Sequence, residues 1–142
     1  MEKRESDRVH LNWLLKLGIK TFRGMRILDL GCGSGYICHK AMQDKAQLAI
    51  GIDMLEPEHS NEKSWTFRNV DLNSPNWFKE LNQSFDLILA FDIIEHLDSP
   101  FLFLTACRNL LVSNGALILT TPNLHSWERF AKPNSWSGVT DP

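Results

Sequence analysis

The feature that most constrains the fold is an apolar segment that leads into closely spaced glycines and then into a helical pattern. Residues 26–30 (RILDL) form a short apolar run, Gly31, Gly33 and Gly35 follow, and residues 34–43 have helical spacing. Glycine has no Cβ, so such a chain can turn sharply after a strand and let a ligand lie against its backbone. A tight turn without a ligand is the alternative, and the strand and helix on either side favour a nucleotide-like ligand.

Apolar runs and helical patterns alternate along the whole chain, whose 142 residues allow one core. The continuous apolar run at 85–91 is typical of a strand buried on both faces of a parallel sheet, and we expect it near the centre. The alternation predicts an α/β fold, a Rossmann-like parallel sheet with right-handed crossovers and helices on both faces. The expected strands are 26–30, 47–52, 65–70, 85–91 and 116–121, and the expected helices are 6–17, 34–43, 76–81 and 100–112.

Some side chains are expected in the core because of their spacing. Val9, Trp13, Leu14 and Leu17 recur at helical intervals, which predicts an amphipathic first helix. A turn at 114–115 should separate the last helix from the last strand. The other residues expected in or against the core are Trp65, Cys38 and Cys107, together with Trp13.

The composition excludes several classes of protein. Fifteen Lys and Arg balance 17 Asp and Glu, so no basic face indicates a nucleic-acid partner. The three cysteines are odd in number and form no Cys-x-x-Cys pair, which argues against a disulfide scaffold or a zinc site. No apolar run approaches the roughly 18 residues of a membrane span, and the first residues do not resemble a secretion signal. We therefore expect a cytoplasmic protein without a membrane partner.

The glycine-rich turn favours one class of nucleotide-like ligand over another. The dinucleotide fingerprint needs its third glycine at position 36, where this chain has Tyr36. The carboxylate of Asp29 would repel a pyrophosphate and attract an ammonium or sulfonium group. The sequence thus favours a cationic adenosine derivative, and a nicotinamide-dependent oxidoreductase is the less favoured alternative.

Four motifs in order resemble those of the class I S-adenosylmethionine-dependent methyltransferases, from about Gly24 to Asn123. The segment at 28–35 (LDLGCGSG) looks like the first motif, 51–53 (GID) like the acid after the second strand, 71–72 (DL) like the adenine-contacting pair and 91–97 (FDIIEHL) like the segment after the fourth strand. The likeness is greatest to the small-molecule branch that includes the ubiquinone-biosynthesis O-methyltransferases. The resemblance implies S-adenosyl-L-methionine as the cofactor.

The cofactor-binding roles follow from the chemistry of each side chain. Asp53 could accept hydrogen bonds from both ribose hydroxyls, because one carboxylate has two oxygens. Asp71 could accept from the adenine amino group, and Asp29 could hold the methionine ammonium. Each acid could instead be an ordinary turn, cap or helix-proximal residue. The predicted cofactor-binding residues are Asp29, Gly31, Cys32, Gly33, Gly35, Asp53, Met54, Asp71, Leu72 and Phe91.

Asp92, Glu95 and His96 form a separate candidate cluster. Residues at i, i+3 and i+4 of one helical turn face the same side, so the three side chains should converge at the mouth of the cofactor site. Two carboxylates and an imidazole could bind a divalent metal. We expect instead that these side chains pack or hydrogen-bond locally, without a metal. His96 is the candidate catalytic base, because an imidazole with an ordinary pKa of about 6.5 can accept a hydroxyl proton near neutrality.

The chain is expected to have three parts: a lead-in helix (1–23), a cofactor-binding methyltransferase domain (24–123) and a tail (124–142) with Trp127, Phe130 and Trp136. The tail is too short to supply the last two strands of the resembled fold, so the fifth strand should have an open edge. Either the chain is a fragment of a longer protein, or a second copy, another partner or the tail acting as a substrate lid covers this edge. The expected function is O- or N-methylation of a small molecule. The alternative is a truncated cofactor-binding or partner-binding subunit without independent activity.

Overall fold

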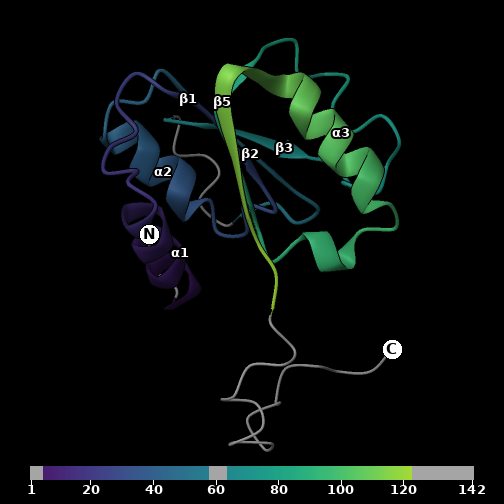
Figure 1. The fold of residues 1–142 in the computed structure, drawn as a ribbon, viewed down its shortest axis with the longest axis horizontal. Coiled ribbons are helices and arrows are strands. Elements are labelled where there is room, and N and C mark those ends of the chain that lie inside the picture. Colours follow the sequence, from purple (N-terminus) through teal and green to yellow (C-terminus); the bar gives the residue numbers. More distant parts are fainter. Residues whose placement is uncertain (1–4, 58–63, 123–142) are drawn as a thin grey trace, which may run out of the picture.

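The computed structural model describes residues 5–57 and 64–122, which form an α/β fold around one parallel sheet (Figure 1). The strands lie in the order β3-β2-β1-β4-β5, and every pairing between them is parallel. This confirms the predicted Rossmann-like sheet, and no strand follows β5 within these ranges. The elements are α1 (Glu5–Lys16), β1 (Arg26–Leu30), α2 (Tyr36–Gln43), β2 (Leu48–Asp53), β3 (Thr66–Asn69), β4 (Phe85–Phe91), the short 3₁₀ helix η1 (Ile94–His96), α3 (Pro100–Leu110) and β5 (Leu111–Thr120).

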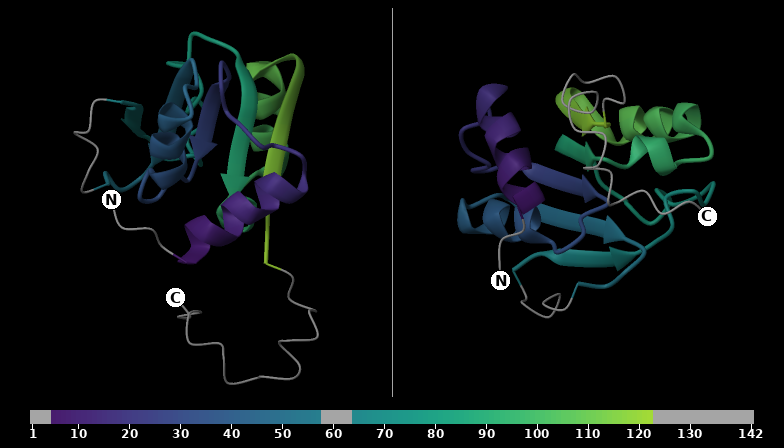
Figure 2. Two further views of the ribbon diagram at one scale, coloured as in Figure 1. Left: turned by 90° about the vertical axis from the view of Figure 1, so that its left-hand side faces the viewer. Right: turned by 90° about the horizontal axis from the view of Figure 1, so that it is seen from below.

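Helices cover both faces of the sheet, as the sequence predicts. Helices α1 and α2 lie on one side and α3 on the other (Figures 1 and 2). Successive side chains of a strand point to opposite faces, so Ile27 packs with the α2 layer and Leu28 with the α3 layer, both fully buried. The apolar run of β4 is buried as expected and lies between β1 and β5, while β1 is the middle strand.

The helix predicted at 76–81 is wrong. This segment is a series of turns, in which the Trp77, Lys79 and Leu81 N–H groups each donate to the carbonyl three residues earlier. Six residues are too few to offset the cost of helix nucleation. Burial of Trp77 and Leu81 against the sheet produces the apolar spacing that resembles a helix.

The predicted boundary between α3 and β5 is also wrong. The helix begins as predicted, with Pro100 in its first turn and the Ser99 side chain accepting from the Leu102 N–H. It ends at Leu110, and β5 starts at once instead of at residue 116. The pairing register changes from Phe85↔Leu111 to Leu87↔Ala116, so β5 contains more residues than β4 over this stretch. The turn expected at 114–115 lies within this irregular part of β5.

The apolar stripe of the first helix is largely exposed, contrary to prediction. Leu14 is buried, whereas Val9 and Leu17 are exposed and Trp13 is 48% exposed. Instead of entering the core, Trp13 has the Lys16 Nζ 5.1 Å from its ring centroid. The other core predictions, Trp65, Cys38 and Cys107, are confirmed as buried.

Among the described residues, the sheet has an open edge at β5, as the sequence predicts. Strand β5 forms one edge, and no strand in the described ranges pairs with its outer side. The predicted tail, with Trp127, Phe130 and Trp136, lies outside the described residues. None of the described helices has the length and apolar character that crossing a membrane requires.

Candidate active site

The glycine-rich turn lies at the carboxyl end of β1 and is tied to the end of β2. The N–H groups of Gly31 and Cys32 both donate to the Ile52 carbonyl, at 2.8 and 3.0 Å. Gly31 has φ +75°, and a Cβ there would lie 2.2 Å from the Ile93 Cδ1. The turn therefore needs glycine for its conformation and for the close approach of the segment after β4.

Asp53, the last residue of β2, binds this turn directly. Its Oδ2 accepts from the Gly33 N–H at 2.8 Å, and its Oδ1 accepts from the Leu55 N–H at 3.1 Å. Each carboxylate oxygen has about two acceptor sites, so both oxygens can still accept a further hydrogen bond. The side chain is half-buried, which leaves it accessible to a ligand at the sheet's carboxyl edge.

A cavity of about 450 Å³, here called the wide cavity, opens beside Asp53. Its apolar walls come from the loops after β2, β3 and β4. Asp71 also lines it, and its Oδ1 accepts from the Asn73 N–H at 2.9 Å. Apolar walls with a few polar groups suit the binding of a flat heterocycle. The lining residues are Gly31, Asp53, Met54, Leu55, Val70, Asp71, Leu72, Asn73, Ile93, His96 and Leu97.

A second cavity of about 210 Å³, here called the acidic cavity, lies on the other side of Gly31. Helix α1 forms part of it and lies beside the carboxyl ends of the strands (Figure 2, left). Because Gly31 lines both cavities, they adjoin at the glycine-rich turn. The lining residues are Ser6, Asp7, His10, Asp29, Gly31, Cys32, Gly33, Ser34, Ile37, Phe91 and Asp92.

Asp29 is the one buried charged or polar side chain among the described residues, at 3% exposure. Burial, and then the nearby carboxylates of Asp7 and Asp53, raise its pKa to about 7, although the Cys38 thiol, 3.9 Å away, opposes this shift. A cationic partner would stabilise the ionised form of this carboxyl, because a positive charge offsets both the cost of burying a negative charge and the repulsion from the neighbouring carboxylates. The acidic cavity is thus suited to an ammonium or sulfonium group.

The other wall of the acidic cavity contains a contact that the sequence analysis missed. His10 stacks on Phe91, with ring centroids 4.3 Å apart, and its Nε2 lies 3.4 Å from the Asp92 Oδ2. The Thr120 hydroxyl donates to the Asp92 Oδ1 at 2.9 Å. No local pattern indicates this contact, because His10 and Asp92 are 82 positions apart in the chain.

The predicted convergence of Asp92, Glu95 and His96 on one helical turn is wrong. Only 94–96 is helical, and Asp92 lies before it in a left-handed conformation with φ +54°. Asp92 contacts α1 and β5, whereas His96 lines the wide cavity. Within the described ranges, no group of three His, Cys, Asp or Glu side chains is arranged to hold a metal ion.

The remaining predicted site residues fall on the two cavities with one exception. Asp53, Met54, Asp71 and Leu72 line the wide cavity, and Asp29, Cys32, Gly33 and Phe91 line the acidic one. Gly35 lines neither. It is the N-cap residue just before α2, with φ +73°, and packs against Trp65. A Cβ there would be 2.1 Å from the indole Cζ2, so glycine at this position lets the turn pack.

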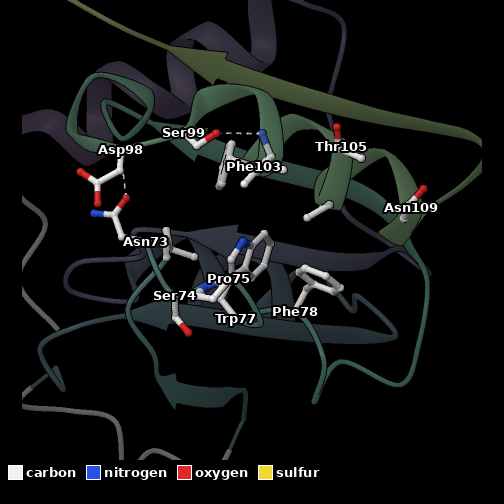
Figure 3. A pocket seen from close by; sticks show the side chains of 13 residues that line it. Asn73, Ser74, Pro75, Trp77, Phe78, Asp98, Ser99, Phe103, Thr105 and Asn109 are labelled. Atoms are coloured by element: carbon white, nitrogen blue, oxygen red, sulfur yellow. Dashed lines mark hydrogen bonds between the residues drawn. The ribbon is translucent and has the colours of Figure 1, made fainter.

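A third cavity of about 210 Å³ lies behind the wide cavity, between α3 and residues 72–78 (Figure 3). The Trp77 and Phe103 rings, 5.8 Å apart, form much of its apolar surface. Leu72 and Asn73 line this rear cavity as well as the wide one, so they separate the two.

Comparison with known proteins agrees with this geometry. The family described as "Methyltransferase domain" matches residues 3–140, nearly the whole chain. The ubiquinone biosynthesis O-methyltransferase of Rhodopseudomonas palustris is 32% identical over 124 residues, which cover 80% of this chain and 46% of that protein. Its counterpart in Bradyrhizobium diazoefficiens is 30% identical over 113 residues, covering 76% and 44%. The chain therefore spans less than half the length of these relatives.

Solved structures share the fold at low sequence identity. A SAM-dependent methyltransferase from Archaeoglobus fulgidus superposes with a TM-score of 0.67 at 24% identity, over 87% of this chain and 57% of that one. Coclaurine N-methyltransferase, bound to N-methylheliamine and SAH, superposes with a TM-score of 0.64 at 22% identity, over 83% and 38%. The parallel sheet is thus the fold of these enzymes, and the family match over nearly the whole sequence shows that this chain belongs to the methyltransferase domain family.

Proposed function

We propose that this domain, residues 24–123, binds S-adenosylmethionine across the wide and acidic cavities and transfers its methyl group to a small molecule. The observation that carries the proposal is the meeting of the two cavities at Gly31, with Asp53 on one side and the buried Asp29 on the other. The family match supports the same activity.

The residues present fit the cofactor. Gly31 lines both cavities, so a ligand that spans them would lie against the glycine-rich turn. Asp53 retains acceptor sites for ribose hydroxyls, and Asp71 has its Oδ2 for an adenine amino group beside the Leu72 backbone. Asp29, with its pKa raised to about 7 by burial, would hold the methionine ammonium.

Positioning is the main contribution of this chain to the reaction. When bound, S-adenosylmethionine supplies a methyl group that its sulfonium already activates. Aligning an acceptor for attack can contribute on the order of 7–11 kcal/mol in favourable cases, so no elaborate catalytic set is required. His96, exposed on the wall of the wide cavity, is proposed to accept the proton of an acceptor hydroxyl or amine.

The acceptor is proposed to be a small molecule methylated on oxygen or nitrogen. The curated relatives reported above are named as O-methyltransferases of ubiquinone biosynthesis, and one structural neighbour is an N-methyltransferase with a bound small-molecule amine product. Because these relatives are named as enzymes, they favour methyl transfer over a subunit that only binds the cofactor.

Titration calorimetry with S-adenosylhomocysteine tests the proposal. Wild-type protein should bind one equivalent, Asp53→Ala should bind at least about tenfold more weakly through loss of charged hydrogen bonds, and Glu80→Ala should match wild type. Glu80 is an exposed acid that lines none of the cavities described above. A folded protein that shows no binding at about 1 mM ligand, or that prefers NAD, overturns the proposal. Methyl transfer to a panel of phenols and amines then tests catalysis, and intact binding without any transfer would favour the binding subunit.

A further inference from the structure

Two of the loops that line the wide cavity begin from strands that are not neighbours in the sheet. One wall is the loop after β3, at 70–73, and the other is the segment after β4, at 93–97. Strands β2 and β1 lie between β3 and β4, so three strand spacings, ~14 Å, separate the strands from which these loops begin. Strands β3 and β4 do not pair with each other, so no strand pairing joins the two loops directly.

Asn73 connects the two loops through both ends of its side-chain amide. Its Oδ1 accepts from the Asp98 N–H at 2.8 Å, and its Nδ2 donates to the His96 carbonyl at 3.4 Å. Figure 3 shows the Asn73 side chain reaching the Asp98 backbone across the edge of the rear cavity. The connection joins residues 25 positions apart in the chain.

Asn73 also orders the loop from which it comes. Its own N–H donates to the Asp71 Oδ1 at 2.9 Å, which fixes the turn that presents Asp71 and Leu72 to the wide cavity. The residue thus links the proposed adenine-contacting pair to the segment that contributes His96. Around this connection the walls are apolar side chains, whose contacts have no fixed direction.

We propose that Asn73 is a positioning residue that fixes the two walls of the wide cavity at the separation needed to hold the adenosine part of the cofactor. This inference rests on the proposed function, because it assumes that the wide cavity receives adenosine. Asn73 need not touch the reacting atoms. Its effect is to hold Asp71 and Leu72 on one side and Ile93 and Leu97 on the other at a binding-competent spacing.

Calorimetric titration of S-adenosylhomocysteine and of adenosine separates this role from a general structural one. Asn73→Ala should weaken both ligands by a similar factor, about tenfold, which is the change that ~1.4 kcal/mol of lost hydrogen bonding produces. The binding stoichiometry should stay the same. Asn73→Asp keeps an acceptor for the Asp98 N–H but loses the donor to His96, so its affinity should be intermediate.

Two control variants sharpen the comparison. Asn109→Ala removes the same amide from an exposed position on α3, outside the wide cavity, and should leave both affinities unchanged. Asp29→Asn should weaken S-adenosylhomocysteine but not adenosine, because Asp29 lines only the acidic cavity. This contrast assigns the effect of Asn73 to the adenosine end.

The outcomes distinguish the inference from the proposed function. If Asn73→Ala binds both ligands as wild type does, or if only its stoichiometry falls because fewer molecules are folded, the positioning role is wrong and the proposed function stands. If it weakens S-adenosylhomocysteine alone, the wide cavity does not receive the adenosine as proposed and the inference also fails. A wild-type protein that binds neither ligand overturns the proposed function and this inference together.

Discussion

The Gly33 N–H donates to the Asp53 Oδ2 at 2.8 Å, and this bond connects the glycine-rich turn after β1 to the end of β2. The other carboxylate oxygen accepts from the Leu55 N–H. One side chain thus shapes the turn, orders the loop after β2 and still offers acceptor sites to a ligand. Any change at Asp53 should alter both the order of the turn and ligand binding.

Asp53→Asn separates these contributions. The amide keeps one oxygen for the Gly33 N–H, but its NH₂ group cannot accept from Leu55 or from a ribose hydroxyl. We expect S-adenosylhomocysteine affinity between those of wild type and Asp53→Ala, with a stability loss of about 1–2 kcal/mol. Calorimetry and urea denaturation check this. An asparagine variant that binds as tightly as wild type would show that the carboxylate does not contact the ribose.

Gly31→Ala should destabilise the protein and weaken cofactor binding together. The new Cβ would lie 2.2 Å from the Ile93 Cδ1, and φ +75° is unfavourable for alanine. Strain and displacement of Ile93 should cost about 2–4 kcal/mol of unfolding free energy. In Gly31→Ala/Ile93→Ala the clash is absent while the backbone strain stays, so the two substitutions should cost less than the sum of their single effects. Additive costs in urea denaturation would contradict the clash.

Gly35→Ala should be more damaging than an alanine at a glycine with the same φ. Gly35 and Gly24 both have φ +73°, but a Cβ at Gly35 would lie 2.1 Å from the Trp65 ring, whereas a Cβ at Gly24 has nothing within 4 Å. Gly24→Ala therefore measures the backbone strain alone, about 1 kcal/mol. Gly35→Ala adds displacement of a buried indole, and a further 1–3 kcal/mol is expected. Equal melting temperatures for the two variants would rule out the close packing of Trp65.

The strands were predictable from sequence where apolar residues predominate, as in 26–30 and 85–91, because burial on both faces leaves few polar positions. The false helix at 76–81 arose because buried turn residues can repeat the spacing of a helix. Trp13 was misplaced for a related reason: helical spacing identifies an apolar stripe but not whether another element covers it.

The site was predictable only as far as local motifs extend. The glycine-rich turn, Asp53 and Asp71 lie at or just after the carboxyl ends of predicted strands. Those ends meet at one edge of a parallel sheet, so the three features can be placed together from the sequence. The contacts of His10 with Asp92 and of Asn73 with Asp98 join residues 82 and 25 positions apart. They depend on how α1 and the two loops pack, which residue spacing does not encode.

The raised pKa of Asp29, about 7, predicts a stability that depends on pH with a definite sign. Between roughly pH 4 and pH 7 the folded protein holds a proton on Asp29 that the unfolded chain has released. The free energy of unfolding therefore decreases as pH rises through this range. Asp29→Asn removes the penalty for a buried charge and should be more stable than wild type at pH 8, by up to about 4 kcal/mol. Near pH 4 the difference should be small, and urea denaturation at the two pH values measures it.

Asp86→Asn provides a control of opposite sign. The Arg26 N–H and guanidinium bind the Asp86 carboxylate and lower its pKa, so its contribution is present above the ordinary range for aspartate and is lost as pH falls. Asp86→Asn should therefore lose stability at pH 8, where Asp29→Asn gains it.

Asp29→Asn should also bind S-adenosylhomocysteine more weakly, because a neutral amide cannot offset an ammonium charge. A variant that is more stable at pH 8 yet binds less would show that the buried carboxylate is kept for the ligand at a cost to the fold, whereas a gain in stability with unchanged affinity would place the ammonium elsewhere.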